Sequence, residues 1–422
     1  MRQVLIWKMR SPGSEYDIDR GIDCRDQYVK TIQNGNFNIG NRLWLQGLMS
    51  VIDTGENQYV YRTPEMTADE INDQFDFIIL PEANLLSERY QGSMKEYIAA
   101  FSRIKIPVYI IACGAEAPSF EALDDLVKNI GDVSSRFIET IYNTGGEFAL
   151  RGEFTKALFD RLGFSGAVVT GCTSLYQMGR AFHVPGIDQN EDIRPIFNGR
   201  ISIVQALMKA WPQSEHMDQE AFLHALYMPK GNKLKYKDLL ALYRRHGLYA
   251  TELLRDDRIR LVPDMYNWHT YMAHSNANYS FGTRIHGNIM AIMSGIPATV
   301  VAIDSRTREM AEFFNLPYII HKRGHSYSPE ELQACYTEAD YSKFNETFST
   351  KYDAFAKFLI DHQIVSHLNE ENAYFDSDKE YYEPPMGINR DYYRKAADYM
   401  AAHETIFKLG SIALGIKKRL HF

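Results

Sequence analysis

Cysteine is scarce in this sequence, and the spacings typical of metal ligands are missing. The chain has four cysteines among 422 residues, Cys24, Cys113, Cys172 and Cys335, and none of them forms a C-x-x-C pair. This pattern excludes a zinc knuckle and a disulfide framework. The histidines show no ligand spacing either. We therefore predict no metal and no cofactor, and a reducing cytoplasm is the simplest setting.

Long apolar runs and an excess of positive charge are also missing. No run of about 18 apolar residues occurs, so no transmembrane helix is predicted. The N-terminal segment MRQVLIWKMRSPG has too short an apolar stretch for a signal peptide. The formal net charge is -8, whereas broad nucleic-acid binding needs an electropositive surface. We expect a cytoplasmic protein that binds no nucleic acid, although a local basic pocket can still bind a small anion.

Three common catalytic signatures are absent as well. No G-x-G-x-x-G follows the first predicted strand, and no G-x-x-x-x-G-K-S/T occurs. These absences argue against an NAD-dependent enzyme and a P-loop enzyme. A G-x-S-x-G elbow is also missing, so a hydrolytic triad is not indicated.

The sequence does contain a repeated alternation of short apolar runs and amphipathic helical segments, which is typical of an α/β protein with parallel sheets. We predict two Rossmann-like lobes, over residues 1–185 and 200–325, and a helical extension over 326–422 that packs back on them. The stretch 182–199 is predicted as a linker, and 201–207 as the opening strand of the second sheet. Because ligands bind at the carboxyl ends of strands, we expect the site in the cleft between the lobes.

The strongest site signal lies between residues 279 and 304, where a strand, a cation-rich turn, a helix and a second strand follow one another. A helix N-terminus has unpaired N–H groups and a partial positive charge, so it attracts anions. A phosphate or carboxylate pocket is therefore predicted at the turn. In the alternative interpretation the arginine caps the sheet edge and the histidine only packs. The residues of the predicted pocket are Arg284, Ile285, His286 and Gly287.

Arg151 has the matching place in the first lobe, directly after the strand EFAL and before the helix GEFTKALFDRLG. Arginine binds carboxylates and phosphates through paired N–H donors. Two arginines at two strand ends, one in each lobe, indicate a ligand held across a cleft. A structural ion pair of Arg151 with Glu153 or Asp160 is the alternative.

Two other segments of the first lobe are candidates for the site. Asn38, Gly40 and Asn41 form a loop before a helix, where glycine allows close approach and asparagine offers both donors and acceptors. Glu82 follows the strand FDFIILP. It is a candidate general base, or else a cap of the next helix.

Asp304 and Arg306 follow the strand that adjoins the Arg284 turn. Asp304 can orient Arg306 or Arg284. We expect its role to be that of a structural ion pair that supports the site.

The C-terminal segment, residues 405–422, mixes apolar residues with Lys408, Lys417, Lys418 and Arg419. We expect a closing helix that packs on the body with its basic end in water. The alternative is an amphipathic helix that rests on an anionic membrane, at the inner face. The sequence leaves a homo-oligomer open.

Three segments of the chain resemble the polysaccharide pyruvyl transferase family. They are NFNIGNRLWLQGL, then ALRGEFTKALFDRLGF with VVTGCTSLY, and most specifically TRIHGNIMAIMSGIPATVVAIDSRTREMAEFFNLP. The resemblance implies a two-lobed fold similar to that of B-type glycosyltransferases. It also implies transfer of a pyruvyl group from phosphoenolpyruvate to a saccharide, usually as a ketal that bridges two hydroxyls.

The resemblance also implies roles for single residues. Arg151 matches an arginine that helps to hold the donor, and Arg284 with His286 matches an Arg-x-His pair that contacts its carboxylate and phosphate. The chain departs from the family pattern at Asn41, where aspartate is common, and at Thr173, where proline is usual. It also has PEANLL, with Glu82, where a glycine-rich turn is expected.

The leading hypothesis is therefore pyruvyl transfer to a cell-surface glycan or its precursor in the cytoplasm. A sugar hydroxyl attacks the donor after protonation of its methylene carbon, and phosphate leaves as a second hydroxyl closes the ketal. His286 protonates or neutralises the phosphate, and Glu82 is the candidate base. The alternatives are a glycosyltransferase that uses a nucleotide sugar and a glycan-binding relative without catalysis.

Overall fold

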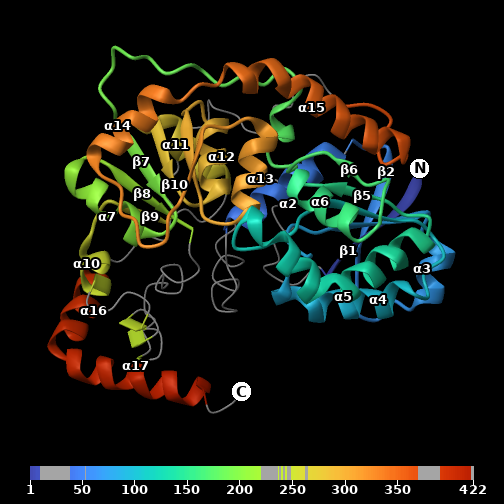
Figure 1. Ribbon diagram of the computed structural model, residues 1–422, viewed down its shortest axis with the longest axis horizontal. Coiled ribbons are helices and arrows are strands. Elements are labelled where there is room, and N and C mark those ends of the chain that lie inside the picture. The colour runs from blue at the N-terminus through green and yellow to red at the C-terminus, as the bar shows by residue number, and fades with distance from the viewer. Residues whose placement is uncertain are drawn as a thin grey trace.

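Two six-stranded parallel sheets form the centre of the molecule, one in each lobe (Figure 1). The computed structural model describes residues 1–9, 39–52, 54–219, 236, 239–240, 243–244, 249–261, 265–368 and 390–419. The sheets confirm the predicted α/β class with two Rossmann-like lobes. The helices after residue 328 confirm the helical C-terminal extension.

The first sheet has the strand order β2-β1-β3-β4-β5-β6. Strands β3 and β5 are apolar and wholly buried, as expected for strands covered on both faces. The strands are β1 (Arg2–Met9), β2 (Asn57–Arg62), β3 (Phe77–Pro81), β4 (Val108–Cys113), β5 (Phe148–Leu150) and β6 (Val168–Val169).

Helices cover both faces of the first sheet. One apolar cluster joins it to α3, α4, α5 and α6, and another joins it to α2. The helices are α2 (Ile39–Ile52), α3 (Ala68–Gln74), α4 (Gln91–Phe101), α5 (Leu123–Asn143) and α6 (Glu153–Arg161), with short 3-10 turns η1 (Glu88–Tyr90), η2 (Phe120–Ala122) and η3 (Tyr176–Met178).

The second sheet has the order β12-β11-β10-β7-β8-β9. Counted from its own first strand this is 3-2-1-4-5-6, the order of the dinucleotide-binding fold. The strands are β7 (Pro195–Asn198), β8 (Glu215–Asp218), β9 (Ile259–Leu261), β10 (Tyr279–Gly282), β11 (Ala298–Ala302) and β12 (Tyr318–Ile320).

Helices flank the second sheet as well, and a helical extension follows it. One face packs against α7 and α14, and the other against α11, α12 and α13. The helices are α7 (Ile201–Ala210), α10 (Tyr249–Arg255), α11 (Met265–His274), α12 (Ile285–Met293), α13 (Ser305–Phe314), α14 (Pro329–Glu338), α15 (Ser342–Asp361), α16 (Arg390–Ala402) and α17 (Glu404–Arg419).

The two lobes share one apolar core. A continuous cluster of buried side chains runs from β1 and α2 of the first lobe through α12 of the second and into α15. Helix α15 returns from the second lobe across the first, where Asn57 Nδ2 donates to the Ile364 carbonyl at 2.6 Å (Figure 1). The shared core thereby joins the two lobes beside the cleft between them.

The structure corrects the prediction for the start of the second sheet. Strand β7 lies inside the stretch 182–199 that was predicted as a linker, and residues 201–207 belong to helix α7. Ile201, Val204, Leu207 and Met208 are buried at helical spacing. The β-branched residues of 201–207 led to the prediction of a strand, whereas the spacing of the buried side chains is that of a helix.

Candidate active site

A small pocket of about 70 Å³ lies between the lobes at the carboxyl ends of the strands. Among the described residues, its lining carries three guanidinium groups and one imidazole, and no carboxylate. Such a lining favours a ligand with more than one negative charge. The first lobe contributes Asn41, Asn84 and Arg151, and the second contributes Gln219, Thr283, Arg284, Ile285, His286, Ile303, Arg306, Thr307 and Met310.

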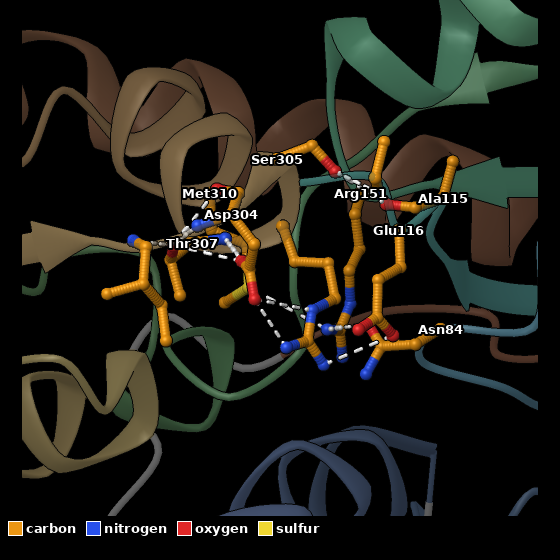
Figure 2. A network of polar contacts seen from close by, with 11 residues as sticks. Asn84, Ala115, Glu116, Arg151, Asp304, Ser305, Thr307 and Met310 are labelled. Atoms are coloured by element: carbon orange, nitrogen blue, oxygen red, sulfur yellow. Dashed lines mark hydrogen bonds and ion pairs between the residues drawn. The ribbon is translucent and has the colours of Figure 1, made fainter. Parts of the chain in front are cut away.

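Arg151 is the cation of the first lobe, and it is 2% exposed. Its backbone N–H donates to the Cys113 carbonyl at 2.8 Å, which fixes the residue at the end of β5. Its Nη1 donates to Asn84 Oδ1 at 3.3 Å (Figure 2). Its Nε and Nη2 are buried and have no hydrogen-bond partner among the described residues. A buried guanidinium in this state calls for an anionic partner.

The turn between β10 and α12 is held by side-chain amides. Asn198 Oδ1 accepts from the backbone N–H of Arg284 at 3.1 Å, and Asn198 Nδ2 donates to Asn288 Oδ1 at 2.8 Å. Asn288 Nδ2 in turn donates to the Gly282 carbonyl at 2.9 Å. The Arg284 side chain makes no cap hydrogen bond with α12. Ile285 and His286 of its first turn line the pocket, so the positive end of this helix faces it.

Gly287 supports this helix end from behind. A Cβ at this position would lie 2.2 Å from Gln219 Nε2 and 2.8 Å from Asn198 Cγ. Only glycine therefore lets both amide side chains reach the first turn of α12. Gly287 itself is not one of the residues that line the pocket.

His286 is buried in the wall of the pocket, with Nε2 3.7 Å from Cys172 Sγ. Burial, followed by the charges of Arg151, Arg306 and Arg284, lowers the pKa of His286 well below its usual value. The imidazole is therefore neutral at pH 7. An anion among the three arginines would offset their charge and raise this pKa.

Asp304 and Arg306 form an ion pair at the edge of the pocket, as predicted. Arg306 Nη2 lies 2.5 Å from Asp304 Oδ2, and Asp304 Oδ1 accepts from the backbone N–H of Thr307 at 2.9 Å as the cap of α13 (Figure 2). Arg306 Nη1 also lies 3.6 Å from Glu116 of the first lobe. The pair orients Arg306 and connects the two lobes.

Glu309 is a second connection between the lobes. Its carboxyl group, 2% exposed, accepts from the backbone N–H of Thr155 at 3.0 Å and lies 3.0 Å from Thr155 Oγ1. The second lobe thus places a carboxyl group on the first turn of α6, directly after Arg151. Burial raises the pKa of Glu309 to about 8.

These features of the pocket agree with the comparison of the sequence with known families. The model of the polysaccharide pyruvyl transferase family matches residues 25–305, which is more than half of the chain. The chain belongs to the polysaccharide pyruvyl transferase family. It is therefore a transferase, and the family implies a pyruvyl donor and a saccharide acceptor.

Several solved structures are similar in fold at low sequence identity. A putative UDP-N-acetylglucosamine 2-epimerase from Listeria monocytogenes is 12% identical, with a TM-score of 0.44 over 88% of this chain and 98% of that chain. The glycosyltransferase SnogD from Streptomyces nogalater is 11% identical, with a TM-score of 0.32 over 85% and 95%. The family assignment does not depend on either likeness. No curated protein matches this sequence.

The predicted site residues of this family member divide into those that the pocket brings together and those that it does not. Asn41, like the residues from Arg284 to His286, lines the pocket. Gly40 is buried in α2, and Asn38 lies outside the described residues. Glu82 is not in the lining. Its Oε1 accepts from the Tyr97 hydroxyl at 2.6 Å.

Some pocket residues were missed by the sequence analysis, although the rule of strand ends points to them. Gln219 directly follows β8, a strand that was not predicted. Asn84 lies two residues beyond Glu82 in the segment after β3. Met310 and Glu309 lie on α13 and reach the site because this helix docks on the first lobe, which no local pattern could reveal.

The described residues lack two other features. No group of three or more histidine, cysteine, aspartate or glutamate side chains is placed to hold a metal ion in this part of the chain. No described helix is long and apolar enough to cross a bilayer.

Proposed function

We propose that the protein transfers the pyruvyl group of phosphoenolpyruvate to two hydroxyls of a cell-surface glycan or its precursor, with a ketal as the product. The observation that carries this proposal is the pocket between the lobes, whose described lining residues supply three guanidinium groups, one imidazole and no carboxylate. Phosphoenolpyruvate presents both a carboxylate and a phosphate. It is thus an anion for which such a lining is suited.

In this proposal each lobe binds one end of the donor. The unpaired Nε and Nη2 of Arg151 form a fork that suits a planar carboxylate or two phosphate oxygens. The open N-terminus of α12, with Arg284, supplies N–H groups and positive charge for the other anionic group. Arg306, held by Asp304, adds charge at the rim.

The proposed reaction consumes two hydroxyl groups of the acceptor and one molecule of phosphoenolpyruvate. The oxygen of the first hydroxyl bonds to the central carbon of the donor, while the methylene carbon gains a proton and becomes a methyl group. The oxygen of the second hydroxyl then displaces phosphate, and its proton leaves with the phosphate. The net products are the ketal and inorganic phosphate.

His286 and Glu82 are the proposed proton carriers. His286 is neutral before the donor arrives, and the donor's negative charge favours its protonation, so it can then give a proton to the departing phosphate. Glu82 stays our candidate base for the sugar hydroxyl. Its support is its position at the end of β3, two residues before the pocket residue Asn84.

A donor panel tests the proposal directly. Release of inorganic phosphate from phosphoenolpyruvate in the presence of acidic and neutral oligosaccharide acceptors is the expected result. Release of nucleotide from nucleotide sugars instead would favour a glycosyltransferase. No turnover of any donor, with saccharide binding intact, would favour a glycan-binding relative. A cytoplasmic location follows from the proposed donor.

Calorimetric titration of phosphoenolpyruvate tests the site itself. Arg284→Ala is expected to abolish donor binding and to leave the fold intact, because the change removes a side chain that lines the pocket at the start of α12. Arg161→Ala is the matched control, since Arg161 is exposed and pairs with Asp124 on the surface. Equal donor affinity in wild type and Arg284→Ala would rule out the assigned pocket.

A further inference from the structure

Helices α16 and α17 form an arm that extends from the second lobe and lies below it in the view of Figure 1. Arg255 of α10 pairs with Asp398 of α16 at 2.6 Å, and Asp257 pairs with Arg394 at 2.9 Å. The arm is therefore attached through α10. It takes no part in the pocket between the lobes.

One side of α17 packs against Tyr236, Leu240 and Tyr243. Phe407 is fully buried, and its ring centroid lies 5.1 Å from that of Tyr236 and 5.8 Å from that of Tyr243. Gly410 allows this close packing, because a Cβ there would lie 3.0 Å from the Tyr236 hydroxyl and 3.1 Å from Leu240. The helix is thus held in one orientation.

The opposite side of α17 exposes a row of large apolar residues. Ile406, Leu409 and Ile412 are 52%, 63% and 54% exposed. Their spacing of three residues places them on one face of the helix. Most other exposed apolar side chains of the described chain are single residues on separate elements, such as Val168, Ile320 and Ile360. A row of this kind indicates a docking surface.

The charge of α17 indicates which partner the row meets. The helix sequence has one acidic residue, Glu404, and four basic residues, Lys408, Lys417, Lys418 and Arg419, while the whole chain carries a net charge of -8. A second copy would bring one basic helix against another, which like charges oppose. An anionic lipid surface complements both the apolar row and the basic end.

We propose that the Ile406–Leu409–Ile412 row of α17 docks this protein on an anionic membrane surface. The row enters the boundary between headgroups and acyl chains, and the basic residues lie among the headgroups. The body then rests on the membrane through its second lobe. This inference does not depend on the identity of the donor.

Co-flotation of the full chain with vesicles tests the proposal. Wild type is expected to bind vesicles of phosphatidylcholine mixed with phosphatidylglycerol roughly tenfold or more tightly than vesicles of phosphatidylcholine alone. The triple variant Ile406→Gln, Leu409→Gln, Ile412→Gln removes the apolar row without a change of charge, and glutamine preserves the helix. It is expected to lose binding to the anionic vesicles by roughly tenfold or more.

A matched variant controls for the loss of apolar surface in general. Val168→Gln, Ile320→Gln, Ile360→Gln changes three exposed apolar residues outside the arm and is expected to bind like wild type. Equal binding of the α17 variant and wild type, or no binding of wild type to either vesicle, overturns the proposal. It is also overturned if wild type forms a dimer by light scattering that the α17 variant cannot form, because the row then belongs to a second copy.

Discussion

The same local construction occurs in both lobes, but the N-terminus of its helix is used differently in each. In each lobe a strand leads into an arginine and then into a helix, at Arg151 and α6 in the first and at Arg284 and α12 in the second. In the first lobe, the protein's own carboxyl group, Glu309, occupies the first turn of the helix through Thr155. In the second, the side chain of the N-cap residue Arg284 makes no cap hydrogen bond, and Ile285 and His286 of the first turn line the pocket. One helix end thus serves the contact between the lobes, and the other remains for a ligand.

The strand orders explain part of this difference. The order reverses between β1 and β3 in the first sheet and between β7 and β10 in the second. Ligands of open α/β sheets bind at such points, and α12 starts at the second of them. Arg151 follows β5, which is two strands away from β3. The first lobe therefore reaches the pocket with a long side chain, whereas the second uses a helix end.

The largest expected effect comes from removing the buried cation of the first lobe. Arg151→Met is expected to weaken the binding of phosphoenolpyruvate by roughly a hundredfold or more, because a charged hydrogen-bonded partner is lost. The empty protein should become more stable by about 1–3 kcal/mol, because burying a charge without a full set of partners is costly. Calorimetry and urea unfolding measure the two effects. A destabilised variant with normal donor affinity would show that Arg151 is purely structural.

The next effect concerns Glu309, whose carboxyl group accepts a hydrogen bond from the first turn of α6. The pKa of Glu309 is raised to about 8 from an ordinary 4.5, so folding favours the neutral carboxyl group. The resulting contribution of Glu309 to the free energy of unfolding is fully present below about pH 4.5 and is lost as pH rises through about 8. In urea unfolding, the free energy of unfolding of wild type should therefore fall as pH rises across this window. Glu309→Gln should remove this part of the slope, and Glu338→Gln, at an exposed position of α14, should not.

His286 tests whether the open helix end of the second lobe receives the donor's charge. A bound dianion is expected to raise the lowered pKa of His286, so wild type should take up a fraction of a proton on binding, and its affinity should rise as pH falls. His286→Gln should take up fewer protons. Calorimetric titration in two buffers with different ionisation enthalpies gives the number of protons taken up. The same count in both proteins would place the donor away from His286.

The smallest effects come from a pair of helical glycines, one in each lobe. Gly287→Ala should destabilise the protein by about 1–3 kcal/mol, because its Cβ would overlap the amides of Gln219 and Asn198. Gly131→Ala on α5 should stabilise it by about 0.5–1 kcal/mol, since the nearest atom to the new Cβ would lie 3.4 Å away, in ordinary contact. Thermal unfolding checks both. A loss of stability at Gly131 comparable to that at Gly287 would contradict the difference.

The part of this site that the sequence could predict is the part made by local structure. Arg151 and Arg284 were found because each directly follows an apolar strand, and in parallel sheets such positions lie at the ligand-binding edge. Gln219 was missed because β8, with the sequence EHMD, has only four residues and little apolar character. Glu309 was missed for a different reason. Its partner Thr155 is 154 residues away, and only the docking of the two lobes brings them together.

The two passages of the chain between the lobes lie against each other. The segment that leaves the first lobe passes beside α15, the helix that returns to it. Asn345 of α15 accepts from the Val184 N–H at 2.9 Å and donates to the Val184 carbonyl at 3.0 Å, and Phe182 meets Phe348 edge to face at 5.7 Å. Two connections between the lobes that lie along one line allow rotation only about that line. Any opening of the cleft should therefore follow a single axis along this seam, which would return Arg151 and Arg284 to the same separation at every closure.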